Sequence, residues 1–216
     1  MITTAHSLDV RVAAHCINHS TIQMLLDLGI DTLEHGTGIT EELLQQMSDK
    51  RVGWSPTLSA FYSYRPPGST PWDQVGAVLK KAIGRGVRVA TGGDTGVFPH
   101  GKNALEMQLM FRLGIPWEEI IRAATWTGWL CVRGVYWDSA EGQAELSGYE
   151  KVGGWEDKVM RDNDVAVGCI APGFAADIIA TEGDLEENFE QAVEEQSICF
   201  VMKGGVVYKR DGMSCC

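Results

Sequence analysis

The most constraining feature of this sequence is a regular alternation of short apolar segments with longer amphipathic ones. The short segments predict strands at residues 10–15, 30–35, 52–58 and 87–91. The amphipathic segments predict helices at residues 20–29, from residue 40 onward, and at 75–83, 103–113 and 116–124. Strands and helices that alternate in this way form a parallel sheet with crossover helices. A repeat of about 20 to 30 residues is typical of a (β/α) barrel.

The number of predicted strands is too small for a complete barrel. A closed (β/α)8 barrel has eight strands and typically about 250 residues, whereas four strands are predicted in this chain of 216 residues. Four units also leave two open sheet edges, which promote aggregation unless they are covered. We therefore expect an α/β fold over residues 1–137 that is half of a TIM-type barrel.

The character of the sequence changes after residue 137. Residues 138–167 contain many charged residues and glycines and predict an insertion or loop. Residues 176–180, 197–202 and 206–208 predict strands, the last two joined at Gly204-Gly205, a hairpin turn that tolerates positive φ. Residues 168–216 therefore predict a small antiparallel β appendage. Earlier in the chain, residues 61–71 predict a long irregular loop over a site.

Composition and charge exclude several classes of function. Hydrophobic residues make up 44% of the chain and charged residues 22%, as in an ordinary globular domain. A net charge of −11 repels phosphate backbones and anionic lipid, so we expect neither a nucleic-acid nor a membrane partner. No apolar run approaches the ~20 residues that span a bilayer. The six cysteines form no C-x-x-C pair, which favours reduced thiols and a cytoplasmic location.

Three polar residues stand where predicted strands end: His15, His35 and Asp94. The carboxyl ends of barrel strands and the loops after them form the active site in this architecture. Imidazole and carboxylate groups are suitable ligands for zinc or a related divalent ion. The glycines around Asp94 allow the backbone to approach a metal or a substrate closely. On the residues alone, each histidine can equally be an ordinary loop or core residue.

An ordered set of motifs carries a family resemblance. The motifs are Val-Ala-Ala-His15, Leu-Glu-His35-Gly, Thr-Gly-Gly-Asp94-Thr-Gly, Pro-His100-Gly-Lys-Asn103, Ala-Ala-Thr125-Trp-Thr127 and Gly168-x-Ile-x-Pro172-Gly173-x-x-Ala-Asp177-Ile-Ile. In this order they resemble the C-terminal half of the amidohydrolase superfamily, in its imidazolonepropionase-like and Xaa-Pro dipeptidase-like branch. The last motif resembles the return of the chain into the family's second domain, so the resemblance implies that residues 168–216 form a small β-sandwich appendage. Each motif is short, and the resemblance rests on their order along most of the chain.

The resemblance implies a metal-dependent hydrolase that cleaves the C–N bond of an amide, a cyclic amide or a dipeptide-like small molecule. It implies that His15 and His35 bind a divalent metal ion, zinc above all, and that Asp94 is both a ligand and the general base. The family's His-x-His pair and carboxylated lysine have no counterpart before His15. We therefore expect one or two ions with an incomplete second site, and an N-terminally truncated chain.

Further residues have roles that the sequence leaves open. His100 resembles a residue near the substrate and is equally explained as a loop residue without a role. Arg65 is suited to pair with a substrate carboxylate, but an ordinary solvated loop explains it better. Asn103 and Glu106 have the spacing of a capping box for the helix that follows. His6 and His19 are expected to have only structural roles.

Two other functions are compatible with the sequence. A catalytically inactive half-barrel that binds, regulates or complements a partner predicts a folded homo-oligomer without hydrolysis even when zinc is added. A mononuclear site formed by His15, His35 and Asp94 predicts weak activity, because an open half-barrel exposes the ion to water.

Overall fold

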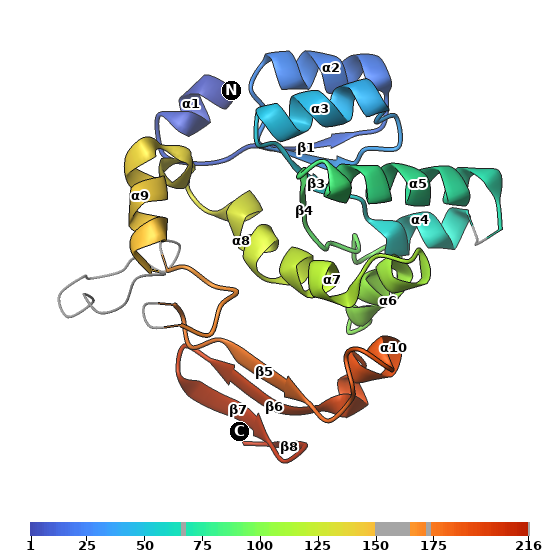
Figure 1. The fold of residues 1–216 in the computed structure, drawn as a ribbon, viewed down its shortest axis with the longest axis vertical. Coiled ribbons are helices and arrows are strands. Elements are labelled where there is room, and N and C mark those ends of the chain that lie inside the picture. Colours follow the sequence, from blue (N-terminus) through green and yellow to red (C-terminus); the bar gives the residue numbers. More distant parts are fainter. Residues whose placement is uncertain (66–67, 150–164, 172–173, 216) are drawn as a thin grey trace.

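The computed structural model describes residues 1–65, 68–149, 165–171 and 174–215. The first part of the chain forms a parallel sheet with strand order β1-β2-β3-β4 (Figure 1). Its strands are β1 (Ala13–Cys16), β2 (Thr32–His35), β3 (Gly53–Ser55) and β4 (Arg88–Val89). The strands are adjacent in chain order, and the predicted mixed α/β fold with its parallel sheet is confirmed.

Helices separate the strands and continue after them. Those up to the last parallel strand are α1 (Ile2–His6), α2 (His19–Asp27), α3 (Glu41–Asp49), α4 (Leu58–Tyr64) and α5 (Thr70–Gly84). After β4 follow α6 (Ala104–Arg112), α7 (Trp117–Ala124), α8 (Trp126–Val132), the 3₁₀ helix η1 (Val135–Asp138) and α9 (Ala140–Tyr149). The C-terminal region adds α10 (Phe189–Ala192) and the 3₁₀ helix η2 (Glu195–Ser197). Among the described residues, no helix is both long and apolar enough to cross a bilayer.

The two faces of the parallel sheet have different environments. Leu33, Trp54 and Val89 are in register, so they share one face, and all three are buried in the main core. Apolar residues of α2, α3 and α5 complete this core, and these helices lie along one side of the sheet (Figure 1). The other face, here called the inner face, carries Thr32 and Gly53, which are also in register.

Helix α8 covers part of the inner face. A Cβ added to Gly53 would lie 2.5 Å from Sγ of Cys131 and 2.9 Å from Cγ2 of Thr32, so only a glycine allows α8 to approach this closely. Cys131 is itself buried. Both faces of the sheet are therefore in contact with helices, at least at its middle strands.

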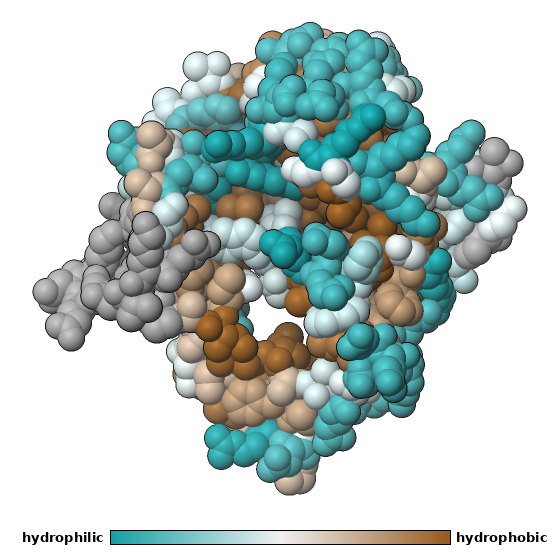
Figure 2. Space-filling view, in the orientation of Figure 1, coloured by the Kyte–Doolittle hydropathy of each residue, from teal (hydrophilic) through white to brown (hydrophobic). Residues whose placement is uncertain are grey.

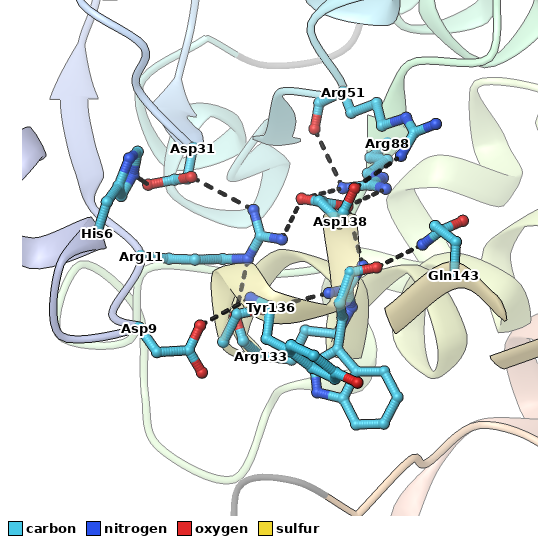
Figure 3. A network of polar contacts seen from close by, with 12 residues as sticks. His6, Asp9, Arg11, Asp31, Arg51, Arg88, Arg133, Tyr136, Asp138 and Gln143 are labelled. Carbon is cyan, nitrogen blue, oxygen red and sulfur yellow. Dashed lines mark hydrogen bonds and ion pairs between the residues drawn. The ribbon is translucent and has the colours of Figure 1, made fainter. Parts of the chain in front are cut away.

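A polar cluster, here called the Arg–Asp cluster, closes the amino-terminal end of the sheet. Arg11, Arg88 and Arg133 converge on the carboxylate of Asp138 (Figure 3). Nη2 of Arg88 donates to Asp138 at 2.8 Å and Nη2 of Arg133 at 3.1 Å. Arg133 is 1% exposed. The cluster joins the segment before β1 to β4 and to the segment after α8.

Three sequence-based predictions about local structure need correction. The predicted loop 61–71 is mostly helical, because α4 continues to Tyr64 and α5 begins at Thr70. The predicted capping box is wrong: Asn103 makes no side-chain cap, and Glu106 instead bonds the first residues of α4. The predicted insertion or loop begins at Asp138, the last residue of η1, and contains helix α9. Its residues 150–164 lie outside the described part.

The C-terminal region forms an antiparallel sheet of β5 (Ile178–Thr181), β6 (Ile198–Lys203), β7 (Val206–Arg210) and β8 (Met213–Ser214). Gly204 and Gly205 have φ of 56° and 80°, as the predicted hairpin turn requires. Within the described residues these strands form one sheet, and the expected sandwich is not confirmed there. Figure 2 shows hydrophobic surface around a hollow between this sheet and the rest of the molecule.

Helix α10 attaches the C-terminal region to the α/β part. Phe189 is buried and stacks on Phe111 of α6, with ring centroids 5.1 Å apart. Arg112 of α6 donates to the Glu190 carboxylate at 2.6 Å. The contact therefore combines an aromatic pair, in which the Phe189 ring is buried, with an ion pair at its edge.

Candidate active site

The two histidines predicted as metal ligands lie side by side. Their rings meet edge to face, with centroids 4.4 Å apart and an interplanar angle of 70°. His15 lies in β1 and His35 ends β2, and the two strands are paired in parallel. Parallel pairing brings the carboxyl ends of neighbouring strands to one edge of the sheet, so residues twenty positions apart become neighbours.

The backbone at this edge departs from the extended conformation after three successive strands. His35, Thr57 and Asp94 have φ of 70°, 51° and 60°. Positive φ is uncommon outside glycine, and residues held in such conformations cluster at functional sites. Gly36 also has positive φ, and a Cβ there would lie 2.6 Å from the indole nitrogen of Trp54. The turn after β2 therefore requires glycine next to the histidine.

Two hydrogen bonds fix His35. Nδ1 of its ring is 2.7 Å from the hydroxyl oxygen of Thr57, and its carbonyl accepts from the indole N–H of Trp54 at 3.0 Å. Burial lowers the pKa of His35, and the nearby His15 lowers it further, while Asp94 opposes both effects. Burial and His15 thus favour the neutral form of His35, the form that binds a metal ion.

Asp94 lies close enough to act electrostatically on His35, but it does not complete a metal site. Among the residues that the structure describes, no three His, Cys, Asp or Glu side chains are gathered into a set that could hold an ion. The paired imidazoles fit two positions of a zinc site in chemistry and proximity.

The two residues predicted to contact substrate are both exposed. His100 is exposed in the loop between β4 and α6. Arg65 follows α4 directly, is exposed, and donates from Nη1 to the carbonyl of Tyr64 at 3.1 Å. Their roles in substrate binding stay predictions.

A cavity of about 720 Å³ opens on the inner face of the sheet. Its lining includes Glu34 and Ser55, which are in register with His15 and so share its face. Burial raises the pKa of Glu34, and hydrogen bonds with Thr32 and Ser55 partly offset that effect. Glu34 was not among the predicted site residues, although strand alternation places it on the same face as its register partner His15.

Thr57 and Glu106 were also missed as parts of the site. Thr57 follows β3 and contacts His35, while Glu106 comes from α6 and accepts bonds at the start of α4. The spacing of Asn103 and Glu106 indicated a local cap. No pattern in the sequence shows that the Glu106 carboxylate reaches a helix almost fifty residues earlier.

The sequence of this chain is similar to those of several known proteins. The chain matches no model of a protein family. It is 27% identical over 215 residues to ochratoxinase of Aspergillus niger, which covers 94% of this chain and 38% of that protein. An uncharacterized protein of Mycobacterium tuberculosis is 30% identical over 141 residues, covering 58% of this chain and 38% of its own length. The chain thus spans 38% of the length of these curated relatives.

Solved structures agree with the sequence relatives. The crystal structure of A. niger ochratoxinase has a TM-score of 0.72 at 25% identity and covers 99% of this chain and 44% of its own. A Xaa-Pro dipeptidase with bound methionine in its active site has a TM-score of 0.68 at 24% identity, covering 96% and 47%. These findings confirm the predicted resemblance to the C-terminal half of the amidohydrolases.

Proposed function

We propose that this chain carries part of the active site of a metal-dependent hydrolase that cleaves C–N bonds in a small, dipeptide-like molecule. The observation that carries the proposal is the contact between the His15 and His35 rings at the ends of adjacent parallel strands. The relatives, named as a dipeptidase, an ochratoxinase and amidohydrolases, support the same class of reaction.

In this proposal β1 to β4 correspond to strands five to eight of a (β/α)8 barrel within residues 1–137. Residues 138–167 are then an insertion, and residues 168–216 contribute to a second, β-rich domain. The parallel order of the four strands supports the first part. Coverage of 44–50% of several of the solved relatives is compatible with the same correspondence.

The chemistry follows from the side chains at the strand ends. His15 and His35 would hold a divalent ion, with zinc the first candidate, and Asp94 would approach as a further ligand. Such an ion lowers the pKa of water and polarises a carbonyl group. Asp94 then accepts the proton of the attacking water and passes it to the leaving nitrogen as the C–N bond breaks. His100 and Arg65 are proposed to bind the substrate, Arg65 through a carboxylate.

The first experiment measures metal per chain and hydrolysis together. The 216-residue protein is purified by gel filtration, loaded with zinc, and analysed by mass spectrometry for bound metal. We expect near-stoichiometric zinc that is lost in His15→Ala and His35→Ala and retained in His19→Ala, the matched control. Asp94→Asn is expected to keep most of the zinc and lose hydrolysis of dipeptides and acylated amino acids.

Two results would contradict the proposal. Zinc that is unaffected by both histidine substitutions would place the ion elsewhere in the chain. A folded, zinc-free oligomer without hydrolysis would favour the alternative function, a binding module built on the same half-barrel.

A further inference from the structure

The hydroxyl group of Thr57 has two neighbours but only one proton. Its oxygen lies 2.7 Å from Nδ1 of His35 and donates to the carbonyl of Pro56 at 2.8 Å. When that bond is made, the hydroxyl can only accept from His35. A neutral ring would then carry its proton on Nδ1 and leave the lone pair on Nε2 free.

We propose that Thr57 and Glu106 act together as positioning residues for His35. Thr57 selects the Nδ1–H tautomer, and Glu106 holds Thr57 in the conformation that makes this possible. The inference goes beyond the proposed function but rests on it in one respect, the identity of what the free Nε2 then binds. A histidine whose second nitrogen is held by a hydrogen-bond partner is the usual arrangement at metal sites.

The conformation of Thr57 is costly and is maintained by its surroundings. Its φ is 51°, in the left-handed region that β-branched residues avoid. Thr57 is buried and directly precedes α4 as its N-cap residue, yet its side chain makes no cap bond. A threonine at this position would normally bond the first free N–H groups of the helix. Here the hydroxyl is turned toward His35 instead.

Glu106 takes over the capping that Thr57 does not provide. Its carboxylate accepts from the backbone N–H groups of Leu58 and Ser59 at 2.8 and 2.7 Å, and from the Ser59 hydroxyl at 2.8 Å. These are the free donors at the start of α4. Glu106 is 1% exposed and anchored in α6. The helix after β4 thus fixes the turn after β3, which orients the histidine at the end of β2.

The test reads the tautomer directly in the metal-free protein. Histidine is labelled with ¹⁵N, and two-bond proton–nitrogen spectra are recorded at pH 8, with His35 assigned by comparison with His35→Gln. We expect the wild type to have the proton on Nδ1. Thr57→Val, which keeps the shape and removes the hydroxyl, is expected to move the proton to Nε2, the form that free histidine prefers. Thr57→Ser should restore the wild-type pattern.

Glu106 is tested in the same spectra. Glu106→Gln keeps the volume and one acceptor oxygen, so we expect a mixture of tautomers between wild type and Thr57→Val. Glu190→Gln is the matched control, because it breaks an ion pair with α6 without touching α4. A His35 spectrum unchanged in Thr57→Val would overturn the tautomer assignment. One unchanged in Glu106→Gln would overturn the role of Glu106.

Zinc binding separates this inference from the proposed function. Removing a hydrogen-bond partner of a metal ligand typically weakens metal binding by about 10- to 100-fold. We therefore expect zinc affinity to fall by this factor in Thr57→Val and to stay at the wild-type value in Thr57→Ser. If the wild type binds no zinc but the tautomer shifts as described, the proposed function fails and the positioning role stands. Equal zinc affinity in Thr57→Val and the wild type would show that the tautomer does not position His35 for a metal.

Discussion

The Glu106 carboxylate accepts a hydrogen bond of 2.7 Å from the backbone N–H of Ser59, although 47 residues separate them in the chain. This buried contact has a consequence for stability. Burial raises the pKa of Glu106 to about 7, against the opposing effect of its hydrogen bonds from Ser59 and Leu58. In the unfolded chain the same carboxyl group has an ordinary pKa of about 4.3.

The raised pKa predicts a loss of stability as pH rises. The folded state binds the Glu106 proton more tightly than the unfolded state, so this contribution is complete below pH ~4.3 and lost as pH rises to about 7. Glu106→Gln has no such proton. We expect its stability relative to wild type to rise by about 4 kcal/mol between these limits, at 1.36 kcal/mol per pKa unit. Urea unfolding across this range measures it, and parallel pH profiles would contradict it.

The Arg–Asp cluster predicts a second effect on stability. Asp138→Ala leaves the buried guanidinium of Arg133 without its carboxylate partner, and breaking such a pair costs on the order of 3 kcal/mol. Asp27→Ala is the control, because its ion pair with Lys50 is exposed and contributes less than about 1 kcal/mol. Urea unfolding compares the two. Equal destabilisation by Asp138→Ala and Asp27→Ala would show that the Arg–Asp cluster does not stabilise the fold more than an exposed ion pair does.

The Arg–Asp cluster also predicts how the stability of the fold changes at acidic pH. Burial alone would raise the pKa of Asp138, but hydrogen bonds and charges from Arg88 and Arg11 outweigh it and lower the pKa. The contribution of Asp138 is therefore present above its ordinary pKa of about 4 and lost as pH falls through the lowered value. Glu106 and Asp138 thus act in different pH ranges and with opposite sign.

The sequence predicted those parts of the fold that depend on local periodicity. Alternating apolar and amphipathic segments located all four parallel strands and placed His15 and His35 at adjacent strand ends. Local periodicity did not predict α4, because Glu106, which stabilises the start of that helix, belongs to α6. The Glu106 carboxylate is locally compatible with a capping box, and only tertiary packing shows that it bonds Ser59 instead. Contacts of high sequence separation leave no periodic signal.

The histidine pair predicts a specific response to charge. Burial and the neighbouring His15 lower the pKa of His35, while Asp94 raises it. We therefore expect His15→Ala to raise the pKa of His35 toward its ordinary value and Asp94→Asn to lower it further. An NMR titration of the ¹⁵N-labelled, metal-free protein measures both shifts. A pKa that moves in the same direction in both variants would show that the three side chains do not interact as described.

The contact between α8 and the inner face of the sheet is tested at Gly53. A Cβ at this position would lie 2.5 Å from Sγ of Cys131, so Gly53→Ala is expected to destabilise the fold by about 1–3 kcal/mol through overpacking. Cys131→Ala removes the obstructing sulfur and leaves a small cavity of its own. The double variant should be more stable than the sum of the two single effects predicts, because the added methyl group at residue 53 fills the space that the removed sulfur leaves. Additive losses in urea unfolding would mean that α8 does not pack on this face of the sheet.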